Sequence, residues 1–165
     1  MRLPIPVVYG VRLGLLSSVF LLSTVSGAAA FDAGLPPQTE SIAYEQFAER
    51  PFNDLSVLIY LIDRFKESRL EIIYDGHYFP APMASLVAKW FLGVQYRGET
   101  PREWILKWCT RTVPKGTVIW VRDEKGNFKH SHDILYEELK QLHEACTRDA
   151  RFQGEEGAAC RIEAS

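Results

Sequence analysis

Two stretches of the chain have the pattern of a β-hairpin that runs directly into a helix. The first is LEIIYDGHYF, residues 70–79, where Asp75-Gly76 is a strong turn signal because glycine tolerates a positive φ. The second begins with the β-rich segment TVIWVR, residues 117–122, followed by a glycine-containing turn and a short return strand. Helices are predicted over 81–96 and 132–145, after the two hairpins. This order predicts an α+β fold with a small antiparallel sheet.

Two further segments have helical periodicity and clear start signals. Residues 53–69 begin at an Asn-Asp pair that can cap the first free amides, and residues 101–110 follow a capping box made by Thr100 and Glu103. The apolar faces predicted for the helices are, in chain order, Leu55, Leu58, Ile59, Ile62 and Phe65; Met83, Leu86, Val87 and Trp90; Trp104, Ile105 and Trp108; Ile134, Leu135, Leu139 and Leu142. We therefore expect about four helices packed on the sheet in one domain.

The first 30 residues have the order of a secretory signal peptide. Arg2 and Arg12 are basic, Leu13–Val25 is largely apolar, and three alanines end at Ala30, where cleavage fits best. A membrane anchor is the other interpretation, but the apolar core is roughly a dozen residues, whereas a span needs about 20. We expect a periplasmic or secreted bacterial protein with no stable membrane span after cleavage.

The rest of the chain divides into three parts by composition. We predict a loose leader over 31–52, where three prolines interrupt any apolar period; it is either a simple linker, which we favour, or contains one short helical piece. A globular α+β domain over 53–146 and a flexible charged tail over 147–165 follow. The formal net charge of −2 becomes about −4 when the two arginines of the signal are removed. This charge argues against a nucleic-acid partner, which favours a basic face.

A series of short motifs occurs in order between about residues 70 and 142. The motifs are Tyr74, Asp75, Gly76 and Phe79; Thr100-Pro101-Arg102-Glu103-Trp104-Ile105; Cys109 before Thr110-Arg111-Thr112; Gly116 opening a strand; Gly126 in a turn; and Leu135, Glu138 and Leu139. In this order and spacing the chain resembles the YfeK-like family of small exported bacterial proteins, a domain of unknown function. The resemblance implies an α+β fold and an exported location, and it implies no established reaction, cofactor or partner.

One position departs from that family. Its members often carry a histidine in the helix after the hairpin, near the position of Val87. Any role of that histidine is therefore missing here. At the position of Cys109 the family usually has another small residue, and the resemblance therefore favours a packing role for this cysteine.

Cys109 is the first candidate for chemistry. As a thiolate nucleophile it would use Arg111 to lower its pKa and a histidine as base, which would make the protein a thiol-dependent hydrolase or transferase. As a packing residue it would be a small, apolar-like side chain at the end of a helix. Because a helix C-terminus raises the pKa of a thiol, we favour packing.

Two more cysteines lie near the C-terminus. A bridge between Cys146 and Cys160 would close a loop of roughly 15 residues and contribute about 3 kcal/mol in the chain-entropy model. It would leave Cys109 as the odd thiol, although a pairing of Cys109 stays open.

The segment after the third predicted helix is the best candidate for ligand binding. Thr110, Arg111, Thr112 and Lys115 stand next to Gly116, and two hydroxyls with two cations can hold a carboxylate or phosphate. The other interpretation is that these side chains cap the helix carbonyls and the start of the strand.

The motif His130-Ser131-His132-Asp133 contains residue types that bind metals. However, histidines two residues apart at a strand-to-helix corner point apart unless the backbone bends, and no HExxH or CxxC motif is present. With Ser131 as an N-cap, the two histidines would simply be exposed.

The four tryptophans fit either a sugar- or peptide-binding platform or the core of a small domain, and we favour the core. For function we predict a non-enzymatic binding module of the cell envelope that needs no cofactor and recognises a protein or an envelope ligand. The rivals are a thiol-dependent enzyme using Cys109 and a periplasmic metal binder using His130 and His132.

Overall fold

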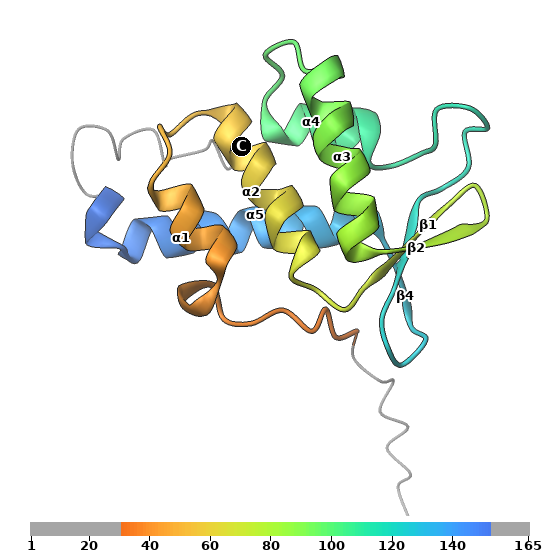
Figure 1. The fold of residues 1–165 in the computed structure, drawn as a ribbon, viewed down its shortest axis with the longest axis horizontal. Helices are drawn as coiled ribbons and strands as arrows, with labels where there is room; N and C mark the ends of the chain where they lie inside the picture. The colour runs from red at the N-terminus through yellow and green to blue at the C-terminus, as the bar shows by residue number, and fades with distance from the viewer. Residues whose placement is uncertain (1–30, 153–165) are drawn as a thin grey trace, which may run out of the picture.

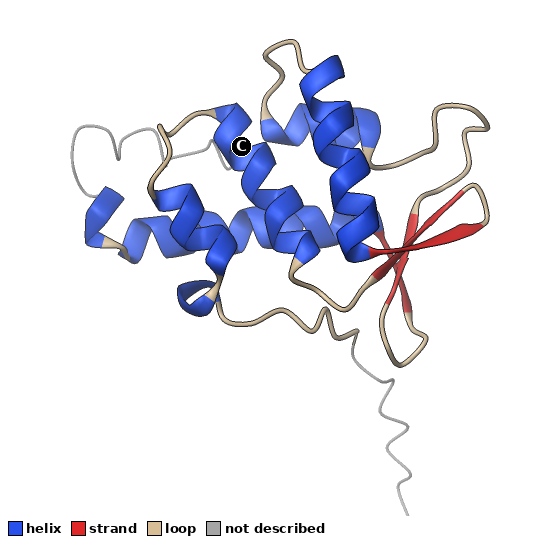
Figure 2. Ribbon diagram, viewed as in Figure 1, coloured by secondary structure: helices blue, strands red, loops and turns tan. Residues whose placement is uncertain are grey.

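A computed structural model describes residues 31–152 and has an α+β fold, as the sequence predicts. The helices are α1 (Ile42–Ala48), α2 (Asp54–Lys66), α3 (Ala81–Gln95), α4 (Pro101–Trp108) and α5 (Ser131–Arg148); the strands are β1 (Glu71–Tyr74), β2 (His77–Pro80), β3 (Trp120–Arg122) and β4 (Phe128–His130); short 3₁₀ helices lie at Gln38–Glu40 and Ala150–Phe152. Figure 1 shows α1, α2 and α3 in front of the long helix α5, and Figure 2 shows the sheet at one end of the helices.

The sheet consists of two hairpins joined through their first strands. Its order is β2-β1-β3-β4, and all neighbours are antiparallel, with Ile72 of β1 opposite Val121 of β3. The predicted turn is confirmed, since Asp75 and Gly76 both have a positive φ, of 51° and 85°. Two such residues in succession make the turn type that matches the twist of a hairpin.

The segment 31–52 is folded where the sequence predicts a loose leader. It contains α1, whose Tyr44 and Phe47 are buried in one core cluster with Tyr60 of α2 and Leu142 of α5. The prolines interrupt the first part of the segment only, and three apolar residues of α1 then share one buried face. The domain therefore starts well before residue 53.

Helix α2 lies in the middle of the fold and is covered on more than one side. Of its predicted apolar face, Leu58 is buried but Leu55 is exposed, and Val57, Tyr60 and Leu61 are buried as well. The sequence predicts that α2 buries a single apolar face, and this is wrong because α1, α3 and α5 all contact the helix and bury more than one side of it.

Helix α5 starts at the predicted cap residue itself, one residue before the predicted start at 132. Ser131 is its first residue, and the Ser131 hydroxyl donates to the backbone carbonyl of Cys109 instead of capping the helix. The tail is predicted to begin at residue 147, but α5 continues to Arg148 and Phe152 packs against the core, so that residues 147–152 are folded. Residues 153–165 lie outside the described residues. Within residues 31–152 no helix combines the length and apolarity needed to cross a membrane.

Candidate functional site

The polar side chains after α4 mostly bind their own loop. The hydroxyl of Thr110 donates to the carbonyl of Leu106 at 2.8 Å, and the guanidinium of Arg111 donates to the carbonyl of Gly116 at 2.8 Å. Lys115 is exposed. Of the two interpretations of this segment, these contacts favour the capping of helix and loop carbonyls over the binding of an external anion.

Thr112 is buried and binds the turn of the first hairpin. Its hydroxyl donates to a carboxylate oxygen of Asp75 at 2.6 Å, and the hydroxyl of Thr117 donates to the same oxygen at 2.7 Å. The hydrogen bond from Thr112, followed by that from Thr117, lowers the pKa of Asp75. A negative charge thus already occupies these hydroxyls, which further disfavours an anionic ligand.

Cys109 lies at the end of α4, between two core clusters. Its side chain packs against the cluster that contains Leu142 and against the cluster that contains Trp104. Burial raises the pKa of the Cys109 thiol to about 12. Since the thiolate is the nucleophile, a thiol that is protonated at neutral pH favours packing over catalysis.

The other two cysteines can be placed only in part. Cys146 is buried in the core cluster with α1 and α2, on the inner face of α5. Cys160 lies outside the described residues. A bridge between Cys146 and Cys160 therefore stays a prediction.

The two histidines of the β4–α5 junction do not point apart. The backbone bends between the last residue of β4 and the first turn of α5, and the rings of His130 and His132 stack with centroids 5.3 Å apart and planes 15° apart. The carboxylate of Asp133 lies beside both rings, and one donor atom from each of the three residues lies within 4.8 Å of the other two. The sequence predicts divergent histidines unless the backbone bends at this corner, and the bend is what brings the two rings together.

The apolar face predicted for α3 points to solvent. The exposed fractions of its four predicted members are Met83 54%, Leu86 72%, Val87 58% and Trp90 68%, and Val94, one turn after Trp90, is 44% exposed as well. Figure 1 shows α3 beside α2, and the contacts of α3 with α2 and α4 involve the opposite side, where Leu92 is buried and Phe91 packs on Trp104 and Trp108. We call these five exposed residues the α3 face.

The spacing within the α3 face is regular. Met83, Val87, Trp90 and Val94 follow one another at intervals of four, three and four residues, with Leu86 beside them. This is the repeat by which one helix packs along another. Contiguous exposed apolar patches of this size are uncommon on folded domains and are often sites where a partner binds.

The tryptophans are divided between core and surface. Trp104 is buried and Trp108 is half-buried, which fits the predicted core, whereas Trp90 and Trp120 are exposed at 68% and 36%. These two exposed rings come from α3 and β3, different elements of the fold. The prediction of a tryptophan core therefore holds for α4 alone.

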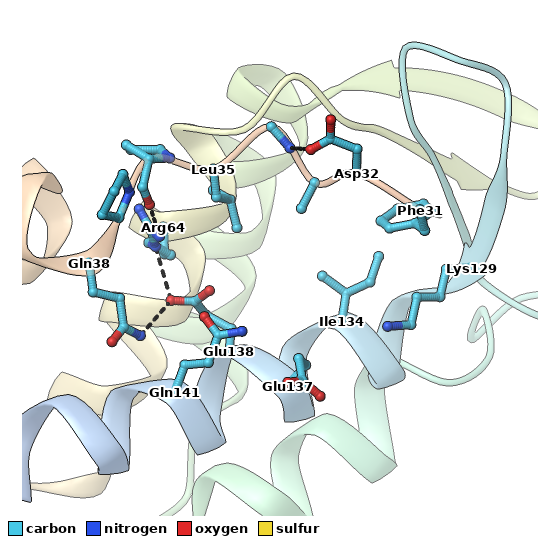
Figure 3. Close-up of a pocket in the computed structure, with 14 residues that line it drawn as sticks. Phe31, Asp32, Leu35, Gln38, Arg64, Lys129, Ile134, Glu137, Glu138 and Gln141 are labelled. Carbon is cyan, nitrogen blue, oxygen red and sulfur yellow. Dashed lines mark hydrogen bonds and ion pairs between the residues drawn. The ribbon is translucent and has the colours of Figure 1, made fainter. Parts of the chain in front are cut away.

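An open groove of about 440 Å³ lies between residues 31–38, α2 and α5. Figure 3 shows that Arg64 and Gln38 both point to Glu138 in this groove. Glu138 is buried and accepts hydrogen bonds from Arg64 at 2.9 Å, from Tyr60 at 2.6 Å and from Gln38 at 3.1 Å. The buried charges are thus paired within the protein, and they hold residues 31–38 to the helices.

The sequence interpretation missed this ion pair, although it contains a signal for it. Glu138 lies on the apolar face of α5, one residue before Leu139 and four before Leu142. A carboxylate on an otherwise apolar helix face requires a buried partner. The partner, Arg64, lies in the last turn of α2, where a positive charge also suits the helix dipole and therefore does not by itself indicate a buried pair.

No family model, no curated protein and no solved structure matches this chain. The resemblance to the YfeK-like family therefore stays a prediction.

Proposed function

We propose that this protein is an exported, non-enzymatic binding module that recognises an apolar helix of another envelope protein through its α3 face. The observation that carries the proposal is the exposure of five large apolar side chains on one face of α3. Their intervals of four, three and four residues match the packing of a second helix. Recognition of this kind places an amphipathic helix against an apolar surface.

The charge of α3 favours a protein helix over a membrane surface. Helices that lie on membranes carry many Lys and Arg residues on their polar side. Lys89 is the single charged residue of α3, and its ammonium pairs with Asp63 of α2. Little positive charge is left on this helix to attract anionic lipid.

The size of the α3 face fits a reversible complex. At ordinary side-chain areas its five residues expose roughly 550 Å², so that a matched pair of faces would bury on the order of 1,100 Å². Specific complexes of this size are small and mostly transient. Trp90 is the expected energetic centre, because exposed tryptophans are enriched among the residues that dominate binding energy.

The experiment is site-specific photocrosslinking of the full chain in its native bacterial host. A photoreactive amino acid replaces Leu86 in the α3 face or, as a control, Glu137 on the exposed side of α5. We expect a crosslinked product from position 86 only, and peptide mapping should place the link on an apolar helix of the partner. Trp90→Ala should reduce the product at least tenfold.

The matched control for the variant is a second exposed leucine. Leu106 of α4 is 54% exposed and lies outside the α3 face. Leu86→Glu should abolish pull-down of the crosslinked partner, while Leu106→Glu should leave it unchanged. The proposal is overturned if position 86 gives no product, or if both variants act alike. If the crosslink joins position 86 only to a second copy of this chain, the α3 face mediates self-association and does not bind another envelope protein.

A further inference from the structure

We propose that His130, His132 and Asp133 form a binding site for one divalent transition-metal ion, with an open coordination position toward solvent. The residues come from the end of β4 and the first turn of α5. The proposal does not rest on the function proposed for the α3 face. It starts from the bend at the β4–α5 junction, which brings the two imidazole rings into parallel contact.

The donor atoms already have nearly the spacing of metal ligands. Nδ1 of His130 lies 3.5 Å from one oxygen of Asp133, and Nε2 of His132 lies 3.2 Å from the other. Around a tetrahedral ion with bonds of about 2.0–2.1 Å, neighbouring ligand atoms are about 3.3–3.5 Å apart. The three donor groups are therefore close enough to share one ion, but because the imidazole lone pairs lie in the ring planes and the rings stack at 15°, one ring must turn before both nitrogens point to it.

Aromatic rings lie beside both histidines, and the contact is closer at His130. The ring of Trp120 in β3 packs on His130 with centroids 4.2 Å apart, and Tyr136, one turn further along α5, meets the edge of His132 at 6.4 Å. A ring held as His130 is by Trp120 loses less conformational entropy when it binds an ion. Ligand orientation by surrounding groups is typical of built metal sites.

The donor set selects the class of metal. Two imidazole nitrogens and one carboxylate oxygen suit copper(II), nickel(II) and zinc(II) rather than magnesium or calcium, which prefer oxygen ligands. At equal geometry copper(II) binds most tightly in this series. The ligand side chains are 40%, 27% and 46% exposed, so that an ion can enter and keep a water molecule.

One feature of His132 limits the affinity. Its Nδ1 is buried and has no hydrogen-bond partner among the described residues. When Nε2 binds an ion, the ring proton must sit on Nδ1, where metal-binding histidines usually donate to an acceptor. Because losing such an acceptor costs about 10- to 100-fold in affinity, we expect a site for exchangeable metal rather than a permanent structural one.

The experiment is isothermal titration of the metal-free full chain with copper(II) chloride and, separately, zinc(II) chloride. We expect one ion per chain, tighter binding of copper, and a rise in melting temperature with each metal. His130→Ala and His132→Ala should each weaken binding by at least about 10- to 100-fold, since a ligand matters more than an outer-shell partner. His77→Ala, which changes an exposed histidine on β2, is the control and should leave binding unchanged.

A spectroscopic readout keeps the test independent of variant folding. The electron paramagnetic resonance spectrum of the copper-loaded wild-type chain should show coupling to two imidazole nitrogens. The proposal is overturned if the wild-type chain binds neither ion at about 1 mM, if the spectrum shows no imidazole nitrogen, or if His77→Ala weakens binding as much as His132→Ala.

Discussion

Helix α3 follows the β1–β2 hairpin and helix α5 follows the β3–β4 hairpin, and each helix begins at the residue after the last strand residue. Each helix also forms one ion pair with α2, Lys89 with Asp63 and Glu138 with Arg64. The apolar face of α5 is buried, whereas the apolar face of α3 is exposed.

The difference arises from what lies next to each helix. Residues of α1, α2 and α4 form a core cluster with Leu139 and Leu142 of α5. Helix α3 packs against α2, and its Phe91 packs on two tryptophans of α4, but no described element covers Leu86 or Trp90. An apolar face is thus a property of the helix, while its burial depends on distant segments, and an uncovered face points to a partner.

The largest difference in stability between matched variants of α3 and α5 is expected at their ion pairs with α2. Glu138→Ala should lower the free energy of unfolding by about 3–5 kcal/mol, because it leaves the buried guanidinium of Arg64 without its main partner. Lys89→Ala removes a half-exposed ion pair and should cost less than about 1 kcal/mol. Urea unfolding followed by circular dichroism measures both. If Glu138→Ala and Lys89→Ala lower the free energy of unfolding equally, the charges at Glu138 are solvated by water in the groove.

A pair of leucines compares the two apolar faces directly. Leu142→Ala should cost about 2–5 kcal/mol, because it opens a cavity in the core. Leu86→Ala should change stability by no more than about 0.5 kcal/mol in the purified chain, since the side chain is exposed. A larger, concentration-dependent loss for Leu86→Ala would show that a second copy covers the α3 face.

A pair of buried serines sharpens the comparison further. In α5 the hydroxyl of Ser131 donates to the carbonyl of Cys109, whereas in α3 the buried hydroxyl of Ser85 has no partner among the described residues. Ser131→Ala should cost about 0.5–1.5 kcal/mol, and Ser85→Ala should be neutral or slightly stabilising. Thermal unfolding of the two variants in parallel shows whether each substitution raises or lowers stability. A loss of stability in Ser85→Ala would indicate that a bound water hydrogen-bonds to the Ser85 hydroxyl.

The smallest effect on stability is expected from the aspartates of the two hairpin turns at acidic pH. The hydroxyls of Thr112 and Thr117 lower the pKa of Asp75 below its usual value of 3.8. A carboxyl whose pKa is lowered by folding stabilises the fold at any pH above its pKa in the unfolded chain, which is about 3.8. This contribution is lost as the pH falls from that value through the pKa in the folded protein. Thr117→Val should shift the pKa of Asp75 upward in a carbon-13 NMR titration.

The second hairpin supplies the control for this titration. Burial acts to raise the pKa of Asp123, but hydrogen bonds, first from the side chain of Asn127, outweigh it and lower the pKa. Because Thr117 does not bind Asp123, Thr117→Val should leave that pKa unchanged. Parallel shifts of both aspartates would point to a general loosening of the sheet.

The candidate sites were predictable in part. Residue types alone identify His130 and His132 as candidate metal ligands, but the bend that stacks their rings depends on how β4 meets α5 and on the packing of Trp120. The apolar residues of α3 are also evident from the sequence, though their exposure is not. The Thr110–Thr112 segment shows the reverse, since promising residue types turn out to bind their own loop and Asp75.

The sequence by itself determined the features that depend on residues close in the chain: the Asp75-Gly76 turn, the capping box of Thr100 and Glu103, and the cap of α2 at Asn53. Each is decided by φ preferences or by hydrogen bonds that span three residues or so. The tertiary structure alone decided that α1 belongs to the core, that Glu138 pairs with Arg64, and that no element within residues 31–152 covers the α3 face. The physical reason is that burial and charge pairing depend on segments far apart in sequence, which local patterns do not place.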